Sequence, residues 1–279
     1  MQVSVITPIF NAAPFVAQSV ESALAQPETA EVLLIEDGST DGSPAVCREL
    51  AARHPRVRLL RHADGGNHGY PASLNLGIRE SRCEWIAFLD ADDFYLPERF
   101  GTAREVIVAD RTIEGVYEAI RLQFDDEAAR RRWEAAGQAS DDLVTIRTRV
   151  APEDFFDRYM SNDIGFFHTN GLTVHRSVFE KTGLFDEHLL LHQDSAMNIK
   201  LAAAARLAPG ELERPVAVMR VHGGNRTSAP RSLDRTYRNK MRCWDTAWAW
   251  SREHLEPEKE QVVLEFLLRQ VVDLPRFNR

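Results

Sequence analysis

Short apolar runs alternate with polar turns and helix-like segments along the first hundred residues. The runs that we expect to form strands cover residues 3–6, 32–35, 57–60 and 85–89. The segments between them, residues 14–25, 44–53 and 72–80, have the pattern of helices. Strands that alternate with helices predict a parallel sheet covered by helices. The runs over residues 32–35 and 85–89 are apolar throughout, which is typical of strands buried on both faces.

The pattern becomes less regular after Pro97. Further strands are predicted over residues 172–174 and 216–221, and further helices over residues 125–139 and 194–207. We therefore predict an α/β fold with a mainly parallel central sheet flanked by helices. The chain is expected to divide into residues 1–100, residues 101–230 and a C-terminal helical extension over residues 231–279.

Polar residues gather where three of the predicted strands end. Thr7 to Asn11 follow the first strand, Glu36 to Asp41 the second, and Asp90 to Asp93 the fourth. In open parallel sheets, ligands bind beyond the carboxyl ends of the strands. The three clusters are therefore expected to lie together at one edge of the sheet and to form a binding site there.

The acidic cluster of Asp90, Asp92 and Asp93 points to a divalent cation. Carboxylates this close repel one another unless a cation neutralises them, and Mg²⁺ and Mn²⁺ prefer oxygen ligands. The alternative is an acidic turn that caps the following helix. The position of the cluster after a buried strand, at the same edge as two other polar clusters, favours the cation.

Three further polar side chains each allow a functional and a structural interpretation. Asp37 suits a hydrogen bond from a nucleotide base or ribose, or a turn in which Ser39 or Asp41 caps the next helix. The imidazole of His222 suits a metal ion, although a single loop histidine is usually only a polar surface group. Asp194 begins a predicted helix, whose dipole stabilises an anion, so it suits a general base as well as a helix cap.

Composition and charge narrow the class of protein. The chain has 279 residues, and its 34 basic and 42 acidic side chains give a formal net charge of −8. This balance argues against a nucleic acid as partner. The three cysteines lack metal-ligand spacing and do not suggest a disulfide framework. We expect neither a signal peptide nor a membrane span, and hence a cytoplasmic protein.

Seven motifs, in this order, resemble glycosyltransferase family 2, the inverting enzymes with the GT-A fold. They are Ser4 to Asn11, Ile35 to Gly42, Asn67 to Ile78, Phe88 to Pro97, Arg176 to Glu187, Gln193 with Asp194, and Val221 to Asn225. The resemblance spans roughly residues 2–228, which leaves the C-terminal segment outside it.

The resemblance implies a role for each candidate residue. Contacts to the donor nucleotide would come from Pro8, Asn11, Asp37, Asn75, Asp90 and Ala91. Within that set, Asp37 would contact the base, and Asp90 would face the ribose and diphosphate. Asp92, Asp93 and His222 would hold Mn²⁺ or Mg²⁺, and Asp194 would be the catalytic base. Residues 1–100 would bind the nucleotide sugar and residues 101–230 the acceptor.

The reaction implied by the resemblance is metal-dependent transfer of a sugar, with inversion, from a nucleotide diphosphate sugar to a hydroxyl group. The donor would be a UDP-sugar, because these are the commonest donors of the family. The acceptor would be a glycan or a lipid-linked glycan, in bacterial cell-surface polysaccharide or glycolipid synthesis. The metal would stabilise the leaving group, and Asp194 would take the proton of the acceptor hydroxyl.

Two positions depart from the family pattern. Leu74 stands where many members have an arginine, so a cationic contact to the diphosphate is missing or comes from Arg226 or Arg79. Gln193 stands where the family has an acidic neighbour of the base.

Other classes of protein fit less well. A dinucleotide oxidoreductase would need a G-x-G-x-x-G turn after the first strand, and none is present. A metal-dependent phosphatase would use Asp90 as nucleophile, but it would resemble the chain only at that motif. A nucleotide-sugar-binding relic without activity is a third alternative, which Leu74 keeps open.

The C-terminal segment suggests a membrane contact through residues 231–250. A basic stretch over residues 231–243 precedes Trp244, Trp248 and Trp250, and such a segment suits an anionic surface at the inner face of the membrane. The alternative, which we favour, is a helix that packs its tryptophans on the rest of the protein.

Overall fold

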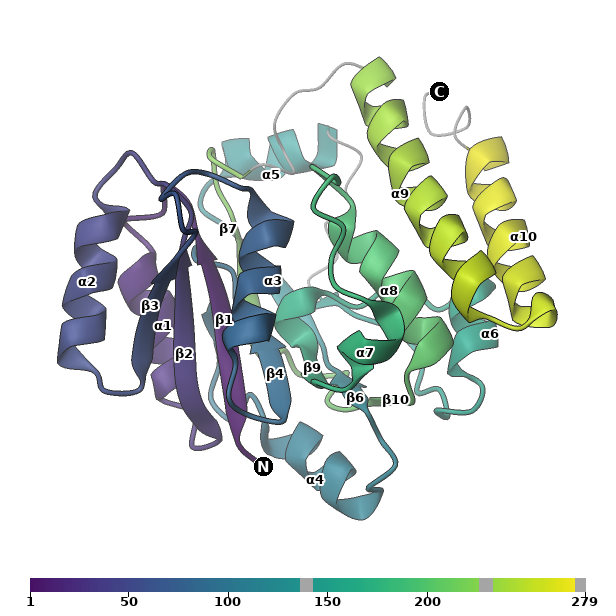
Figure 1. Ribbon diagram of the computed structural model, residues 1–279, viewed down its shortest axis with the longest axis horizontal. Coiled ribbons are helices and arrows are strands. Elements are labelled where there is room, and N and C mark those ends of the chain that lie inside the picture. The colour runs from purple at the N-terminus through teal and green to yellow at the C-terminus, as the bar shows by residue number, and fades with distance from the viewer. Residues whose placement is uncertain (136–142, 226–232, 274–279) are drawn as a thin grey trace.

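The structure, a computed structural model, describes residues 1–135, 143–225 and 233–273. Its central element is a seven-stranded sheet in the order β10-β6-β9-β4-β1-β2-β3. The strands are β1 (Val3–Ile9), β2 (Thr29–Glu36), β3 (Val57–Arg61), β4 (Trp85–Phe88), β6 (Gly115–Tyr117), β9 (Leu172–His175) and β10 (Leu207–Pro209). Among these strands, β9 runs antiparallel to its neighbours β4 and β6. The sheet is otherwise parallel, which confirms the predicted mainly parallel sheet (Figure 1).

Helices cover both faces of this sheet. Helices α1 (Val16–Leu24) and α2 (Ser43–Arg53) pack on the face to which Val5 and Leu34 point. Helices α3 (Tyr70–Glu80), α7 (Val178–Thr182) and α8 (Gln193–Ala204) pack on the face to which Ile6 and Ile35 point. Neighbouring residues of a strand point to opposite faces. The runs over residues 32–35 and 85–89 are therefore apolar throughout, because both faces are covered.

Helix α3 lies very close to β1 at Gly77. A Cβ atom at this position would lie 2.3 Å from Ile6 Cγ2, so the packing requires glycine. The close approach fixes α3 against the sheet. It thereby fixes Gly69 and Tyr70, at the start of α3, beside the loops that follow β1 and β4.

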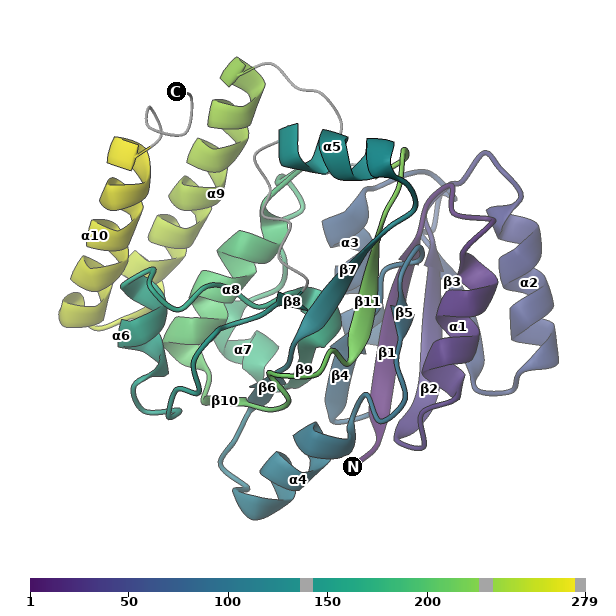
Figure 2. The ribbon, with the colours of Figure 1, turned by 180° about the vertical axis from the view of Figure 1, so that it is seen from behind.

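A smaller sheet beside the central one carries the predicted strand at residues 216–221. Its order is β5 (Phe94–Tyr95), β11 (Ala217–Val221), β7 (Ile120–Phe124) and β8 (Leu143–Val144), and β11 runs parallel to β7 (Figure 2). Helix α5 (Glu127–Ala135) follows β7. Because β11 ends directly before His222, this sheet determines where His222 lies.

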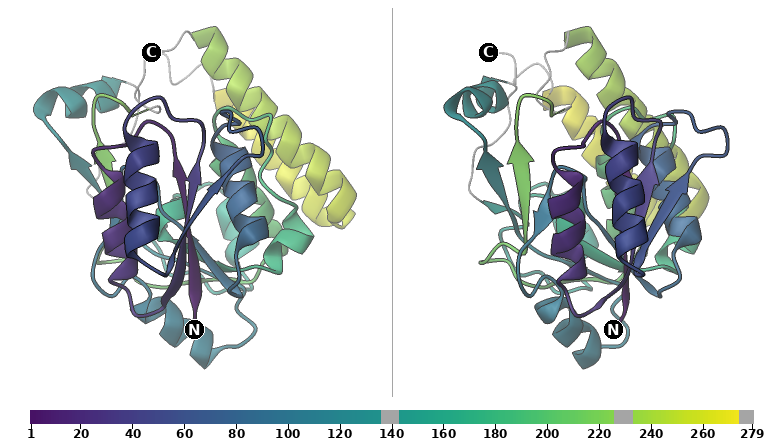
Figure 3. Two further views of the ribbon diagram at one scale, coloured as in Figure 1. Left: turned by 60° about the vertical axis from the view of Figure 1, so that its left-hand side comes forward. Right: turned by 90° about the vertical axis from the view of Figure 1, so that its left-hand side faces the viewer.

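The C-terminal segment forms two long helices, as predicted. Helices α9 (Leu233–His254) and α10 (Pro257–Asp273) run antiparallel, side by side (Figure 1; Figure 3 shows the molecule from two further directions), and α9 packs against α8. Trp250 is part of the main core, and Trp244 and Trp248 are half-buried against it. The structure thus supports tryptophans that pack on the protein over tryptophans that face a membrane. Residues 231 and 232 lie outside the described residues.

No helix in the described part of the chain combines the length and the apolar character needed to cross a membrane. The remaining described elements are α4 (Gly101–Ala109), α6 (Phe155–Met160) and the 3₁₀ helix η1 (Thr169–Gly171).

Some helices and strands have other bounds in the structure than the sequence predicts. The helix predicted over residues 194–207 ends at Ala204, because Leu207–Pro209 form β10 and pair with β6. The helix predicted over residues 125–139 is described over Glu127–Ala135, and residues 136–139 lie outside the described residues. Strands β5, β6, β7 and β8, of two to five residues, were not predicted from the sequence.

Candidate functional site

A cavity of about 540 Å³ lies at the carboxyl edge of the parallel strands. The predicted residues that line it are Pro8, Asn11, Asp37, Asp90, Ala91, Asp92, Asp93, Asp194 and His222. The three polar clusters therefore meet at one edge, as expected from the sheet. Of the predicted site residues, Asn75 does not line this cavity.

Asp92 and His222 form the closest pair of candidate metal ligands. His222 Nε2 lies 3.0 Å from Asp92 Oδ2, and Asn225 Nδ2 donates to the same oxygen at 3.3 Å. The hydrogen bond with Asp92 raises the pKa of His222 above its usual value, although partial burial opposes this. Carboxylate oxygens are ligands that Mn²⁺ and Mg²⁺ prefer, and a neutral imidazole is a common metal ligand in proteins.

Asp93 is held differently. It is 2 % exposed, Oδ1 accepts a hydrogen bond from Arg220 N at 2.8 Å, and Oδ2 accepts one from Asn170 Nδ2 at 2.6 Å. Burial, followed by the charges of Asp92 and Asp90, raises the pKa of Asp93 well above its usual range. Both oxygens of Asp93 are bonded inside the protein, whereas Asp92 Oδ2 lies beside His222, so Asp92 is the better placed of the two predicted metal ligands.

Asp90 is oriented by two neighbours from other elements. Tyr70 Oη, at the start of α3, donates to Asp90 Oδ1 at 2.7 Å. The backbone N–H of Asp90 donates to Asn170 Oδ1 at 3.2 Å. Its carboxylate therefore has a fixed direction at the cavity wall.

A buried ion pair between Arg99 and Glu118 lies next to Asn170 and fixes its backbone. Arg99 Nη1 donates to Glu118 Oε2 at 2.6 Å, and neither side chain has any exposed surface. The same guanidinium donates through Nε to Asn170 O at 3.1 Å and through Nη2 to Leu172 O at 3.2 Å. These contacts hold the segment that leads into β9.

Asp37 fixes the loop before α3. Its carboxylate accepts hydrogen bonds from His68 N at 2.7 Å and from Gly69 N at 2.9 Å. Asn11, after β1, accepts one from Thr40 N through Oδ1 at 2.8 Å. Both residues line the cavity while also connecting neighbouring loops.

Asn75 and Leu74 face the protein interior. Asn75 donates to Phe185 O at 2.8 Å and accepts from Phe185 N at 2.9 Å, so the structure does not support its predicted contact with the nucleotide. Leu74 is fully buried in the core, which means that the residue at this position does not face the cavity. Arg79 lies 3.8 Å from Glu187 and not at the cavity, and Arg226 lies outside the described residues.

Asp194 lies in the first turn of α8, as predicted, and its Oδ1 accepts a hydrogen bond from Ser195 N at 2.8 Å. The cavity that Asp194 lines also includes residues to which the sequence assigned no role: Phe10, Tyr70, His168, Thr169, Leu190 and Leu191. Phe10 and Leu190 are 50 % and 58 % exposed. Large apolar side chains in the mouth of a polar cavity are a signal that only the structure reveals.

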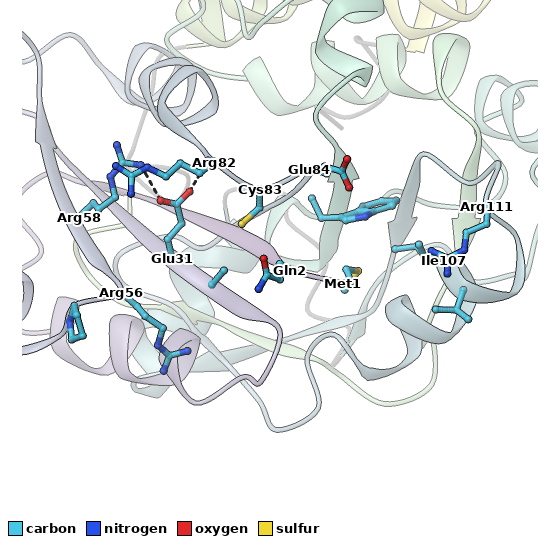
Figure 4. Close-up of a pocket in the computed structure, with 14 residues that line it drawn as sticks. Met1, Gln2, Glu31, Arg56, Arg58, Arg82, Cys83, Glu84, Ile107 and Arg111 are labelled. Carbon is cyan, nitrogen blue, oxygen red and sulfur yellow. Dashed lines mark hydrogen bonds and ion pairs between the residues drawn. The ribbon is translucent and has the colours of Figure 1, made fainter.

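A second cavity, of about 720 Å³, lies at the opposite, amino edge of the sheet. Figure 4 shows Arg58 and the backbone of Arg82 bonded to Glu31 there. None of the predicted site residues lines it. We therefore place the functional site at the carboxyl edge.

Two solved structures share this fold. S. aureus TarS in complex with UDP-GlcNAc matches with a TM-score of 0.70 at 17% identity, over 96% of this chain and 72% of that chain. The mannosyltransferase PcManGT from Pyrobaculum calidifontis, in complex with GDP-Man and Mn²⁺, matches with a TM-score of 0.60 at 19% identity, over 99% and 71%. The fold is that of the GT-A transferases, as the resemblance implied.

The chain belongs to glycosyl transferase family 2, because the model of that family matches residues 4–183. The succinoglycan biosynthesis protein ExoU of Rhizobium meliloti is 43% identical over 99 residues, which are 36% of this chain and 28% of ExoU. The uncharacterized glycosyltransferase EpsJ of Bacillus subtilis is 26% identical over 200 residues, 71% of this chain and 55% of EpsJ. The chain thus spans roughly a quarter to a half of these relatives.

A metal ion fits the site only if the protein and a diphosphate hold it together. Within the described residues, no group of three or more His, Cys, Asp or Glu side chains is placed to hold a metal. Asp92 and His222 supply two donors. Mg²⁺ in proteins is commonly held by one or two carboxylates together with substrate phosphates, so a diphosphate would have to complete the coordination.

Proposed function

We propose that this chain transfers a glycosyl group from a nucleotide diphosphate sugar to a hydroxyl acceptor, with inversion at the anomeric carbon. One observation carries the proposal: carboxylates from the loops after β2 and β4, His222 after β11 and Asp194 on α8 line a single cavity. Its volume of about 540 Å³ is within the usual range for a small-molecule site.

The nucleotide is proposed to lie over the ends of β1, β2 and β4. Pro8, Asn11, Asp37, Asp90 and Ala91 line that part of the cavity, and the half-exposed ring of Phe10 offers an apolar face for a base. UDP is the first choice of nucleotide, because TarS was solved with UDP-GlcNAc. GDP is the second choice, because PcManGT was solved in complex with GDP-Man.

Asp92 and His222 are proposed to hold Mn²⁺ or Mg²⁺ together with the diphosphate. When bound, such an ion neutralises the diphosphate charge and stabilises the leaving group. Asp93 is left out of the ligand set because its oxygens bond Arg220 and Asn170.

Asp194 is proposed to act as the general base. It takes the proton of the acceptor hydroxyl, whose oxygen forms a bond to the anomeric carbon while the bond from that carbon to the diphosphate oxygen breaks. The nucleoside diphosphate leaves with the electron pair, and a single displacement inverts the centre. The proposed acceptor is a glycan or lipid-linked glycan of a bacterial polysaccharide, as the name of ExoU suggests. A cytoplasmic reaction at the inner membrane face remains the prediction from the sequence.

The proposal is tested by incubating the protein with UDP-GlcNAc, UDP-glucose or GDP-mannose and a free or lipid-linked oligosaccharide as acceptor, with Mn²⁺ or with EDTA. We expect release of nucleoside diphosphate in Mn²⁺ only, and NMR of a transfer product should show inverted anomeric configuration. Binding of a nucleotide sugar without any turnover would instead identify a binding relic. Release of inorganic phosphate from simple phosphomonoesters would point to the phosphatase.

A further inference from the structure

We propose that Asp93 and Asn170 act together as positioning residues, whose hydrogen-bonded pair holds Asp92 beside His222 without either of them binding the metal. The inference rests on the proposed function, because it concerns how the proposed metal pair is placed. It gives a role to a carboxylate that the sequence assigns to the metal.

The first observation is that Asp93 connects two segments that are far apart in the chain. One oxygen bonds Asn170 Nδ2 at 2.6 Å and the other bonds Arg220 N at 2.8 Å. Arg220 lies in β11, two residues before His222. Asp93 therefore ties the loop after β4, which carries Asp92, to the strand that carries His222.

The second observation is that the side chain of Arg220 also bonds to the loop after β4, which carries Asp92 and Asp93. Its Nη1 donates to Asp92 O at 2.9 Å, and its Nη2 bonds Gln18 on α1. The backbone of Asp92 is thus held from β11 on one side and through Asp93 on the other. These bonds determine the separation of Asp92 Oδ2 and His222 Nε2.

The third observation is that the side-chain amide of Asn170 cannot flip without losing both of its hydrogen bonds. Its Nδ2 donates to Asp93, and its Oδ1 accepts from Asp90 N. A flipped amide would place an N–H group against the N–H of Asp90 and an oxygen against the carboxylate of Asp93. The backbone of Asn170 is fixed by Arg99 Nε at 3.1 Å, so the direction of the amide is set by the fold.

This arrangement allows an exchange of the two side chains. In the double variant D93N/N170D, the amide at position 93 can accept from Arg220 N and donate to the carboxylate at position 170. That carboxylate can also accept from Asp90 N. Every hydrogen bond is restored and the total charge is unchanged, but the carboxylate has left position 93. A positioning role survives this exchange, whereas a role as metal ligand does not.

The experiment measures the affinity of Mn²⁺ with UDP, and of Mn²⁺ with GDP, by calorimetry for the wild type, D93N, N170D and the double variant. Each single variant should lose about 10- to 100-fold in affinity, because supporting partners of metal ligands have effects of this size, and the double variant should return to within about threefold of the wild type. A cooperative thermal unfolding transition shows which of the variants are folded. V263A, which leaves a gap in the buried packing of α10 away from the cavity, controls for destabilisation alone and should keep its affinity.

Three results would overturn the inference. They are a double variant as impaired as D93N, a double variant that does not fold, and a D93N variant that binds like the wild type. If the wild type bound neither nucleotide with Mn²⁺, the proposed function itself would fall, and this inference with it. The failure of the inference alone is therefore recognisable, since the wild type would still bind.

Discussion

Asp92 Oδ2 and His222 Nε2 lie 3.0 Å apart although 130 positions separate them in the chain. The two residues come from different sheets, since Asp92 follows β4 of the central sheet and His222 follows β11 of the smaller one. Their meeting at the cavity is the geometric basis for proposing a metal shared with a diphosphate.

The first prediction concerns this pair. Replacing His222 with alanine removes one of the two proposed protein donors, so we expect activity at limiting Mn²⁺ to fall by about 10- to 100-fold. Higher Mn²⁺ concentrations should restore part of it. The measurement is nucleotide release against Mn²⁺ concentration, with H188A as control because His188 is exposed and does not line the cavity. Equal Mn²⁺ dependence in both variants would contradict a metal role for His222.

The sequence indicated the site through its strand ends but did not distinguish the roles within it. The apolar runs located the loops after β1, β2 and β4, because strands buried on both faces leave a clear pattern. Strand β4 ends at Phe88, so alternation along a strand does not extend to Asp92 and Asp93. Both carboxylates line the cavity, and the one that is bonded inside the protein, Asp93, takes its partners Asn170 and Arg220 from distant parts of the chain.

Other contributions to the site also lie beyond a sequence pattern. The burial of Leu74 follows from the packing of α3 on β1, so the position where many family members have an arginine does not line the cavity here. Arg99 and Glu118 lie 19 positions apart in the chain. Arg99 follows β5, and Glu118 directly follows β6. Neither belongs to a motif, so only the structure reveals that they support Asn170.

A second prediction concerns Tyr70. Tyr70→Phe removes the hydrogen bond to Asp90 Oδ1 and leaves the ring in place. Hydrogen bonds to charged groups contribute about 1.5–3 kcal/mol, so the KM for the nucleotide sugar should rise by about tenfold or more. The melting temperature should change little, because Tyr70 is only half-buried. An unchanged KM would show that the direction of the Asp90 carboxylate does not matter for the donor.

A third prediction concerns the pH dependence of stability. Burial raises the pKa of Glu118 from 4.5 to about 7, although the charge of Arg99 lowers it. The folded protein then keeps this proton at pH values where the unfolded chain has lost it. The free energy of unfolding should therefore decrease as pH rises from about 4.5 to about 7, by up to about 3 kcal/mol from this group.

The variant E118Q isolates this effect, because glutamine has no proton to lose. Denaturant unfolding of both proteins at several pH values should show a difference in stability that changes across this window and levels off above it. Parallel pH profiles would mean that Glu118 stays ionised beside Arg99 throughout.

A fourth prediction concerns the packing of α3 on β1. Gly77→Ala places a Cβ atom 2.3 Å from Ile6 Cγ2, and overpacking of this kind typically costs about 1–3 kcal/mol. Thermal unfolding should show a lower midpoint. In the double variant G77A/I6A the added methyl group has room, so the two effects should be less than additive. Simple additivity of the two losses would show that α3 and β1 are not in tight contact at this point.

The measurement that tests the central claim most directly compares the wild type with D194N in the presence of Mn²⁺ and a nucleotide sugar that the wild type binds. Asparagine keeps the shape of Asp194 but accepts no proton, and general base catalysis contributes about 10²- to 10⁴-fold to a rate. The account predicts that D194N binds the donor as tightly as the wild type, while transfer of the glycosyl group to an acceptor, measured as release of nucleoside diphosphate, falls by that factor. Turnover of D194N equal to that of the wild type, or a wild type without turnover, would contradict it.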